Sequence, residues 1–506
     1  MLYLDARSAF DVVQRQLLIK NLYHVQGGNS SLLFIDSRLA NRQTVVDYDG
    51  HLMGPINDEQ GLEQGGISSS EFYKIFGKEQ LSLAQHSNLG VPLGSVMVAA
   101  IGQADDTVLI SNDIVFLSYL LDLTKLFCHK YLVELCAEKT HLQVYGMRFV
   151  EQIDVSLESC PIEINGQKIP FSNSAEHVGV VRSTNGNSQA LFQRFRAHHR
   201  ALASVLHQGM ARGHRANPAL SLRIERLYAS PVLFSGLASL ILTKTEVTSV
   251  EKHHRESLRQ LLKLFKGTPR SVTYFLAGSL PGSALLHIRQ LSLFGMIARN
   301  DGSILNRHAI NVFSYQTIIK KSWFHQIRSL CLLYNLPHPQ QLLCHPLEKL
   351  QYKKLIKSKV VDYWESLLRS EADKLNSVPY FNPLFMSLTT VHPIFSTAGH
   401  APLQVAKAKV QAIMLSGRYR CGALTRHWIK NYDGGCKLSS TCKDIIEDLP
   451  HILTQCSALI TTRNNLFQFA KKYVEVLPDC IRFLIYVVPK ILFIINFSLT
   501  ALQYHQ

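Results

Sequence analysis

The chain has 506 residues, of which 46% are hydrophobic and 18% are charged; this composition excludes a disordered chain and allows about two to four domains with buried cores. The formal net charge of +16 favours an anionic partner, either nucleic acid or an acidic membrane surface. Ten cysteines are too few for a disulfide scaffold, and the N-terminus lacks the features of a signal peptide. We therefore expect reduced thiols and an intracellular protein, in the nucleus or the cytoplasm.

The first segment, residues 2–13, is predicted to be a strand that continues directly into a helix. Asp5 falls where the strand ends, so its side chain is expected to face a cleft; the alternative is that Asp5 is a helix N-cap. A domain that begins within a strand leaves that strand without neighbours. We therefore expect part of the parent domain to be missing before Met1.

A glycine pair follows Gln64, at Gly65 and Gly66. Paired glycines allow positive φ or a close approach of the backbone. The serines that come next predict the N-cap of an amphipathic helix that carries Phe72 and Phe76. The start of such a helix can bind an anion; the alternative is an ordinary turn.

The stretch Gln103–Asp106 lies between two apolar runs, residues 94–101 and 108–110, and predicts a β-hairpin. Asp105 and Asp106 then sit at its tip, where each carboxylate makes the other more costly to ionise. A divalent cation such as Mg²⁺ relieves that repulsion; the alternative is a solvated turn.

Helical apolar spacing continues over residues 114–131, and residues 133–145 end in a predicted strand. Strands, helices and a hairpin in this order predict an α+β fold in which acids from distant segments reach one sheet.

Four ordered segments resemble the palm motifs of reverse transcriptases of non-LTR (LINE-type) retrotransposons: Leu4–Asp11, Gln64–Ser69, Ala104–Asp106 and Glu138–Thr140. The resemblance covers about residues 1–185 and implies a polymerase palm of antiparallel sheet and helices, largely without fingers. It also implies an RNA-directed DNA polymerase that uses deoxynucleoside triphosphates, an RNA template and a DNA primer. No other small-molecule cofactor is expected.

By this resemblance, Asp5 and Asp105 would bridge two Mg²⁺ ions with help from the Ala6 carbonyl, and Asp106 would complete the acidic site. One ion would activate the primer 3′-hydroxyl, and both would neutralise charge on the triphosphate.

Phe10 matches the position of a bulky gate against the ribose 2′-hydroxyl, and Gln64 and Gly65 match residues that contact the nucleotide. Lys139 matches a lysine that protonates pyrophosphate as it leaves; the alternative is a surface lysine.

The sequence departs from the family pattern at two positions of the expected site. Gln103 replaces an aromatic residue before the acids. Glu63 replaces a basic residue before Gln64, and we expect it to add negative charge near an acidic site.

Residues 186–284 form a basic helical region that resembles a polymerase thumb. Arginine forks suit phosphate oxygens; the alternative is a solvated helix face. The arginines expected to contact nucleic acid are Arg194, Arg196, Arg200, Arg212 and Arg215. The segment Thr243–Glu246 has the form of a capping box that opens a core helix.

Residues 285–430 are predicted to be a helical connector, and residues 431–460 a zinc knuckle. Three thiols and one imidazole fit a closed tetrahedral zinc site; the alternative is core packing, and Cys421 is a possible substitute ligand. The cluster also resembles the Cys/His knuckle that follows the polymerase in this family. The expected zinc ligands are Cys436, Cys442, His451 and Cys456.

The last segment, residues 461–506, is an apolar tail whose residues 483–502 are interrupted by Pro489, Lys490 and Asn496. A packed terminal helix or a frayed end is expected rather than a membrane span, which needs about 20 mostly apolar residues.

The sequence therefore predicts a reverse transcriptase whose activity is weak or absent because the fingers are missing. The alternative functions are a non-catalytic nucleic-acid-binding remnant of a retrotransposon, and a basic structural protein with a zinc-stabilised C-terminus.

Overall fold

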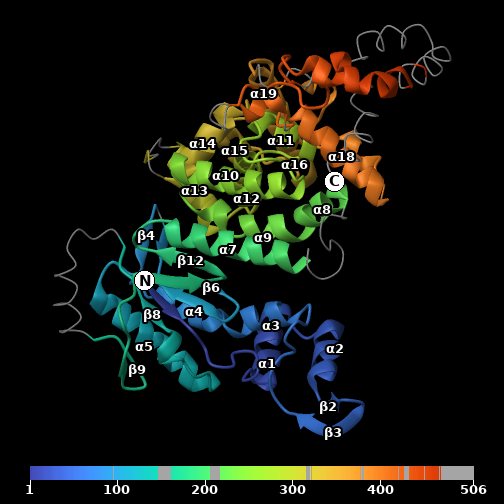
Figure 1. Cartoon of the computed structure of the whole chain (residues 1–506). Coiled ribbons are helices and arrows are strands. Elements are labelled where there is room, and N and C mark those ends of the chain that lie inside the picture. Colours follow the sequence, from blue (N-terminus) through green and yellow to red (C-terminus); the bar gives the residue numbers. More distant parts are fainter. Residues whose placement is uncertain are drawn as a thin grey trace. The chain divides into compact units, whose positions relative to one another are not determined.

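The fold is that of a computed structural model, which describes residues 1–465 and 468 except 95, 146–160, 206–216, 315–318, 321, 376–377, 379–380, 400, 420, 427–431, 449–450 and 466–467. The chain forms two compact units (Figure 1). Unit 1 comprises Met1–Ala190 and Asp301–Thr317, and unit 2 comprises Leu191–Asn300 and Ile318–Gln506. Unit 1 combines small antiparallel sheets with helices, whereas the described part of unit 2 is helical, so the predicted α+β class is confirmed.

The main sheet of unit 1 has four strands in the order β6–β7–β1–β8, all antiparallel. The first strand of the chain lies inside this sheet, between segments that come much later, and its register pairs Leu4 with Thr107. The strands are β1 (Leu2–Leu4), β6 (Ala100–Gln103), β7 (Asp106–Leu109) and β8 (His141–Leu142).

The helices of unit 1 pack their apolar side chains against this sheet in one core, which includes Leu4, Phe76, Leu109 and Phe127. The predicted helix over residues 114–131 is confirmed, and the Asp113 carboxylate caps it by accepting two backbone N–H groups. The helical elements are α1 (Arg15–Gln26), α2 (Ser30–Leu39), α3 (Ser69–Phe76), α4 (Lys78–His86), α5 (Ile114–Tyr131), the 3₁₀ turn η1 (Ala137–Lys139) and α13 (Ile304–Ser314).

The prediction that β1 continues directly into a helix is wrong. Ser8 has a positive φ of 47°, and residues 7–12 form turns, so α1 begins only at Arg15 with Gln14 as its N-cap. Asp5 is therefore not a helix N-cap. The turn is held by the Leu62 N–H, which donates to the Phe10 carbonyl, a distant partner that local spacing does not reveal.

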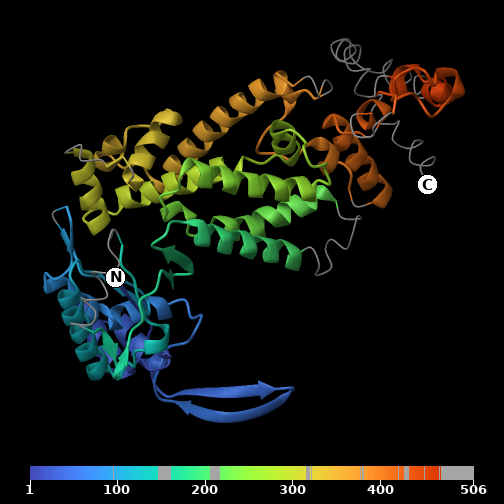
Figure 2. The same cartoon turned by 60° about the vertical axis from the view of Figure 1, so that its left-hand side comes forward.

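Four further hairpins belong to unit 1, and one of them extends away from the other elements of the unit (Figure 2). Its turn, Asp49–Gly50, has φ of 51° and 80°, as a type I′ turn requires, and nearly all of its side chains are exposed. The hairpins are β2–β3 (Arg42–Tyr48 and His51–Asp58), β4–β5 (Val91–Leu93 and Val96–Val98), β9–β10 (Glu163–Ile164 and Gln167–Lys168) and β11–β12 (Ser174–His177 and Val180–Ser183).

Unit 2 is organised around the long helices α10, α12 and α16. The capping box predicted at Thr243–Glu246 is confirmed at the start of α10, and both of its reciprocal hydrogen bonds are present. The α-helices are α7 (Ser188–Val205, which begins at the end of unit 1), α8 (Pro218–Ile224), α9 (Ser230–Phe234), α10 (Lys244–Leu261), α11 (Arg270–Ala277), α12 (Gly282–Arg299), α14 (Trp323–Leu333), α15 (Pro339–Cys344), α16 (Lys349–Asp373), α17 (Pro393–Ser396), α18 (Pro402–Leu415) and α19 (Gly422–Thr425).

Short turns complete unit 2. They include the π-helical turns η4 (Glu225–Ala229) and η8 (His451–Gln455), and the 3₁₀ turns η5 (Leu237–Ser239), η6 (Pro383–Phe385), η7 (Ser440–Cys442) and η9 (Ser457–Leu459). Across the part of the chain that the structure describes, no helix has the length and apolar character needed to cross a bilayer. The apolar segment 483–502 lies outside the described residues.

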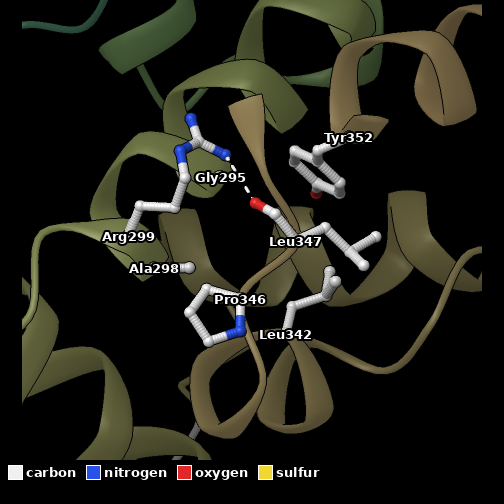
Figure 3. Close-up of a pocket in the computed structure, with 7 residues that line it drawn as sticks. All are labelled: Gly295, Ala298, Arg299, Leu342, Pro346, Leu347 and Tyr352. Carbon is white, nitrogen blue, oxygen red and sulfur yellow. Dashed lines mark hydrogen bonds between the residues drawn. The ribbon is translucent and has the colours of Figure 1, made fainter. Parts of the chain in front are cut away.

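A small pocket in unit 2 marks the contact between α12 and α16 (Figure 3). A Cβ atom added to Gly295 would lie 2.2 Å from the Tyr352 ring, so only glycine allows this approach. The Tyr352 hydroxyl is buried without a hydrogen-bond partner, and the Arg299 guanidinium donates to the Leu347 carbonyl at 3.5 Å. We interpret the pocket as a packing feature, because it has room for about one water molecule.

Candidate functional site

Strand pairing in unit 1 brings the predicted acids together at one end of the main sheet. Since Leu4 pairs with Thr107 in an antiparallel register, Asp5 follows β1 at the level of Asp106, the first residue of β7. Pairing of Gln103 with Asp106 leaves Ala104 and Asp105 as a two-residue turn. Ala104 has a φ of 53°, a conformation that is strained for a residue other than glycine.

The carboxylates at this end of the sheet affect one another electrostatically. Burial is the main reason that the pKa of Asp106 lies above its ordinary value, and the charges of Asp105 and, more weakly, Asp5 raise it further. A divalent cation would relieve this repulsion. Among the described residues, however, the three acids do not form a group tight enough to hold an ion. The Cys/His residues of unit 2 described below do form such a group.

Lys139 lies beside the first of these acids. Its Nζ is 3.7 Å from the Asp5 Oδ2, and its side chain is 72% exposed. The 3₁₀ turn η1 places the lysine there, because the Cys136 N–H at its start donates to the Asp5 carbonyl. The structure therefore brings together Lys139 and Asp5, two residues that the sequence assigned to one site.

Phe10 packs on α3 close to the acidic end of the sheet. Its ring centroid is 5.0 Å from that of Tyr73. Burial raises the pKa of Tyr73, and so does the charge of Asp105, which places the tyrosine near that acid. The predicted helix after the glycine pair is confirmed as α3, but Ser68 at its N-cap makes no side-chain capping hydrogen bond.

Gln64 and Gly65 are exposed on the turn that leads to α3, and Gly65 has a φ of 85°. Their contact with a nucleotide stays a prediction. Ala6 forms an isolated β-bridge with Leu135. The role of the Ala6 carbonyl also stays a prediction.

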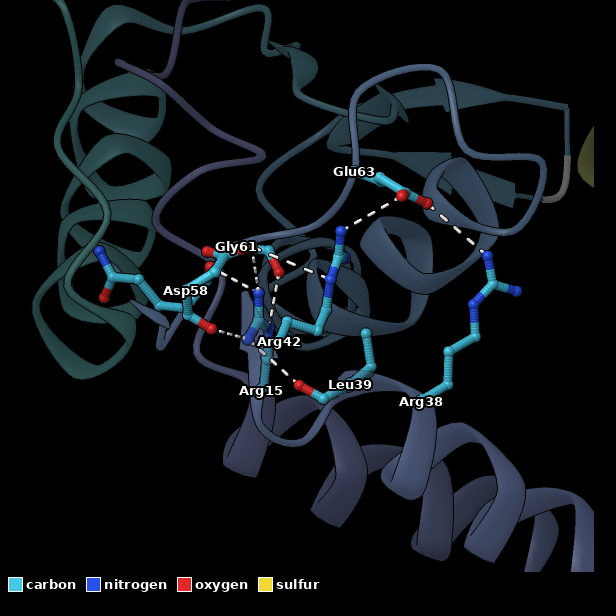
Figure 4. Close-up of polar contacts among 8 residues, drawn as sticks. Arg15, Arg38, Leu39, Arg42, Asp58, Gly61 and Glu63 are labelled. Atoms are coloured by element: carbon cyan, nitrogen blue, oxygen red, sulfur yellow. Dashed lines mark hydrogen bonds and ion pairs between the residues drawn. The ribbon is translucent and has the colours of Figure 1, made fainter. Parts of the chain in front are cut away.

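The loop before Gln64 is held by a buried arginine (Figure 4). The Arg15 guanidinium donates to the carbonyls of Gly61 at 3.0 Å and Leu39 at 3.1 Å, and to that of Asp58. It also donates to the Gln60 carbonyl at 2.9 Å. One side chain thereby fixes residues 58–61, which set the position of the turn that carries the predicted nucleotide contacts.

The sequence suggested that Glu63 adds negative charge near the acids, but the structure shows that its carboxylate is paired. Its carboxylate lies 3.2 Å from the Arg42 guanidinium and 3.6 Å from that of Arg38 (Figure 4). Both arginines come from the segment 38–42, around the end of α2 and the start of β2. Because these pairs balance its charge, Glu63 adds no uncompensated negative charge near the acids.

The hairpin β11–β12 supplies site residues that the sequence did not reveal. The backbone N–H of Val178 donates to the Asp106 carboxylate, and the charge of His177 also favours its ionised form. Val178 has a φ of 52°, which is a genuine outlier for a β-branched residue. Strain of this kind is typical of functional sites, and the only sequence signal for it is the glycine that follows.

The predicted arginine face is confirmed as helical for the residues that the structure describes. Arg196 and Arg200 are exposed on α7, and Arg194 is half-buried there. The Arg196 guanidinium lies 5.6 Å from the centre of the Phe192 ring. Arg212 and Arg215 lie outside the described residues.

The histidine next to these arginines is not part of the basic surface. His198 is fully buried, and its Nε2 is 3.8 Å from the Glu225 carboxylate. The Nε2 of His254, on α10, lies 3.6 Å from the same carboxylate. Burial alone would raise the pKa of Glu225, but the two histidines outweigh it and hold the pKa at about 2. The acid and the two histidines therefore form a buried polar cluster inside unit 2.

The predicted metal ligands of unit 2 come together in one buried cluster. The ligand atoms of Cys436, Cys442, His451 and Cys456 all lie within 4.8 Å of one another. The Cys456 Sγ is 3.8 Å from the Cys436 Sγ and 3.9 Å from the Cys442 Sγ. Tetrahedral zinc with Zn–S bonds of about 2.3 Å requires sulfurs about 3.8 Å apart, so the spacing fits.

Local backbone pairing builds this cluster. The Cys436 N–H donates to the Ile445 carbonyl, and Gly435 bridges Ile446. Both ring nitrogens of His451 are buried and have no hydrogen-bond partner among the described residues, which is costly unless a ligand satisfies one of them. The cluster could therefore hold a metal ion such as zinc. Cys421 lies in the same apolar cluster but is not among the grouped ligands.

No protein-family model and no curated protein sequence matches this chain.

Proposed function

We propose that this chain is an RNA-directed DNA polymerase of non-LTR retrotransposon origin, with its palm in unit 1. The observation that supports this most is the pairing of β1 with the β6–β7 hairpin. It gathers Asp5, Asp105 and Asp106, from segments far apart in the chain, at one end of a sheet. If the β6–β7 turn were only a solvated turn, there would be no reason for Asp5, which follows β1, to lie at the same end of the sheet as Asp105 and Asp106.

The donor chemistry of these residues suits Mg²⁺, which prefers carboxylate oxygens. Asp5 and Asp105 would hold two ions together with the Ala6 carbonyl, and Asp106 would add to the negative field. When bound, the ions would activate a primer 3′-hydroxyl and neutralise charge on the triphosphate. Since the three acids are not clustered as tightly as a metal site in this structure, ion binding would draw them closer.

The other residues would position the substrates. Phe10, packed on Tyr73, would exclude a ribose 2′-hydroxyl and so favour deoxynucleotides. Gln64 and Gly65, on the loop that Arg15 fixes, would contact the incoming nucleotide. Lys139 would supply a proton to the pyrophosphate that leaves, and its contact with Asp5 keeps it at the site.

The second candidate function is a non-catalytic nucleic-acid-binding remnant. The exposed Arg196 and Arg200 on α7 and the net charge of +16 favour it, because arginine forks bind phosphate without any catalytic acid. The Cys/His cluster, with zinc bound, would assist by holding RNA.

Primer extension on an RNA template separates the two candidates. If the first candidate is right, the purified chain should extend a DNA primer at least weakly with Mg²⁺ and deoxynucleotides, and Asp105→Asn should abolish this extension while RNA affinity stays unchanged. Asp122→Asn is the matched control, because Asp122 is an exposed acid on α5 that pairs with Lys125. If the wild-type chain binds RNA and never extends the primer, the remnant is the better description.

A further inference from the structure

Helix α16 of unit 2 has one buried face and one free face. It runs for 25 residues from Lys349 to Asp373, and every fourth side chain along it packs into the core of the unit. The buried residues are Tyr352, Ile356, Val360, Trp364, Leu368 and Ala372. The side chains between them are exposed or half-buried, and the charges of the exposed ones decide what that face can contact.

The charges on α16 are separated along its length. The first eleven residues carry five lysines and no acid, whereas the last twelve carry four acids and one arginine. A helix is stabilised by acids near its N-terminus and by bases near its C-terminus, so this order opposes the helix dipole. The lysines are Lys349, Lys353, Lys354, Lys357 and Lys359, of which the first four are exposed.

Two acids of the second half, Glu365 and Glu371, have charged partners inside the unit. The Glu365 carboxylate lies 2.8 Å from the Arg369 guanidinium and accepts the Leu388 N–H at 3.0 Å. The Glu371 carboxylate pairs with Arg270. These contacts explain why acids are found at this end of α16 in spite of the dipole.

The lysines have no such explanation. Within the described ranges, none of Lys349, Lys353, Lys354 and Lys357 forms an ion pair. Lys353 lies four residues from both Lys349 and Lys357, a spacing at which like charges destabilise a helix. The arrangement therefore weakens the helix locally, and nothing inside the described part of the unit compensates for it.

We propose that the exposed lysine face of α16, formed by Lys349, Lys353, Lys354 and Lys357, binds the phosphate backbone of a nucleic acid. Lysines four residues apart repeat every ~6 Å along a helix, which presents a row of point charges to a chain of phosphates. Lysine binds phosphate without reading bases, so the contact would be independent of sequence.

The choice of nucleic acid over an acidic membrane surface has two grounds. It rests on the proposed function, which requires a nucleic-acid duplex. In addition, a helix that binds a membrane surface inserts an apolar face into the lipid, whereas the apolar face of α16 is buried in the core of unit 2.

The test is the salt dependence of duplex affinity for a variant in which these four lysines are replaced by glutamine. For B-DNA, the slope of log K against log salt is smaller by about 0.9 for each phosphate that the protein no longer neutralises, so we expect the slope to decrease by about 3 to 4. The matched control replaces the exposed Lys20, Lys168, Lys252 and Lys374 by glutamine, which changes net charge equally and should leave the slope unchanged.

A slope that is unchanged in the α16 variant, or reduced equally in the control, would overturn the proposal. So would an unchanged slope combined with weaker binding to vesicles of anionic lipid, which would assign the face to a membrane. Thermal unfolding should show the variant at least as stable as the wild type, because like-charge repulsion along the helix is removed. The result does not depend on primer extension, so failure of catalysis and failure of this contact are separate outcomes.

Discussion

Replacement of Cys456 by serine, or removal of metal with a chelator, should unfold the Cys/His segment of unit 2. Cys456 is the thiol whose sulfur is 3.8 and 3.9 Å from those of Cys436 and Cys442, so it is common to both close sulfur pairs. Structural zinc sites have apparent binding free energies of about 10–16 kcal/mol at pH 7. That is comparable to the about 5–15 kcal/mol that holds a whole domain folded, and this segment adds only a small apolar core of its own.

Zinc content and hydrogen exchange measure the effect. We expect one zinc per wild-type chain and none in Cys456→Ser, with fast amide exchange over residues 432–448 and 451–459 in the variant and in chelator. Cys421→Ser is the matched control, because Cys421 is buried in the same apolar cluster and should leave the zinc content unchanged. Full zinc content in Cys456→Ser, or loss of zinc in Cys421→Ser, would refute the assignment of ligands.

Two further predictions concern the stability of unit 2. Gly295→Ala should lower the free energy of unfolding by about 1–3 kcal/mol, because the new Cβ would lie 2.2 Å from the Tyr352 ring. Gly77→Ala is the control and should be neutral, because the nearest atom to its new Cβ would be 3.5 Å away. Equal effects of the two substitutions in urea unfolding would contradict this reasoning. Burial lowers the pKa of His287 from 6.5 to about 4. As the pH drops, this histidine is therefore protonated in the unfolded state before it is protonated in the folded state. The free energy of unfolding should fall by up to about 3 kcal/mol between pH 6.5 and pH 4. His287→Gln should weaken the pH dependence of the free energy of unfolding. The control His345→Gln, at an exposed histidine, should leave it unchanged. An unchanged pH dependence in His287→Gln would show that other groups determine it.

Features that depend on nearby residues could be predicted from the sequence. The capping box at Thr243, the helix over residues 114–131 and the hairpin around Asp105 each follow from residues a few positions apart. The Cys/His cluster could also be predicted, because its four ligands lie within residues 436–456 and one short loop joins them. The order of strands, helices and a hairpin predicts that acids from distant segments reach one sheet, and the four ordered motifs assign three of these acids to one site.

Features that depend on distant partners could not be predicted. The turn at Ser8 replaces an expected helix because Phe10 pairs with Leu62. Glu63 is neutralised by Arg38 and Arg42, and spacing does not indicate which acid an arginine will choose. The contact of Val178 with Asp106 depends on a strained backbone, which local propensity would have ruled out.

The position of β1 inside the main sheet has a consequence for how the protein is made. Its partners are residues 106–109 and 141–142. On a ribosome that adds about 5–20 residues per second, this strand waits roughly 5–20 s for its first partner and roughly 7–28 s for its second. During that time the apolar Leu2–Leu4 is unprotected in the nascent chain. The acids that follow and face this strand can meet once residues 106–109 have emerged, so the candidate catalytic centre can begin to assemble while most of the 506 residues are still to be made.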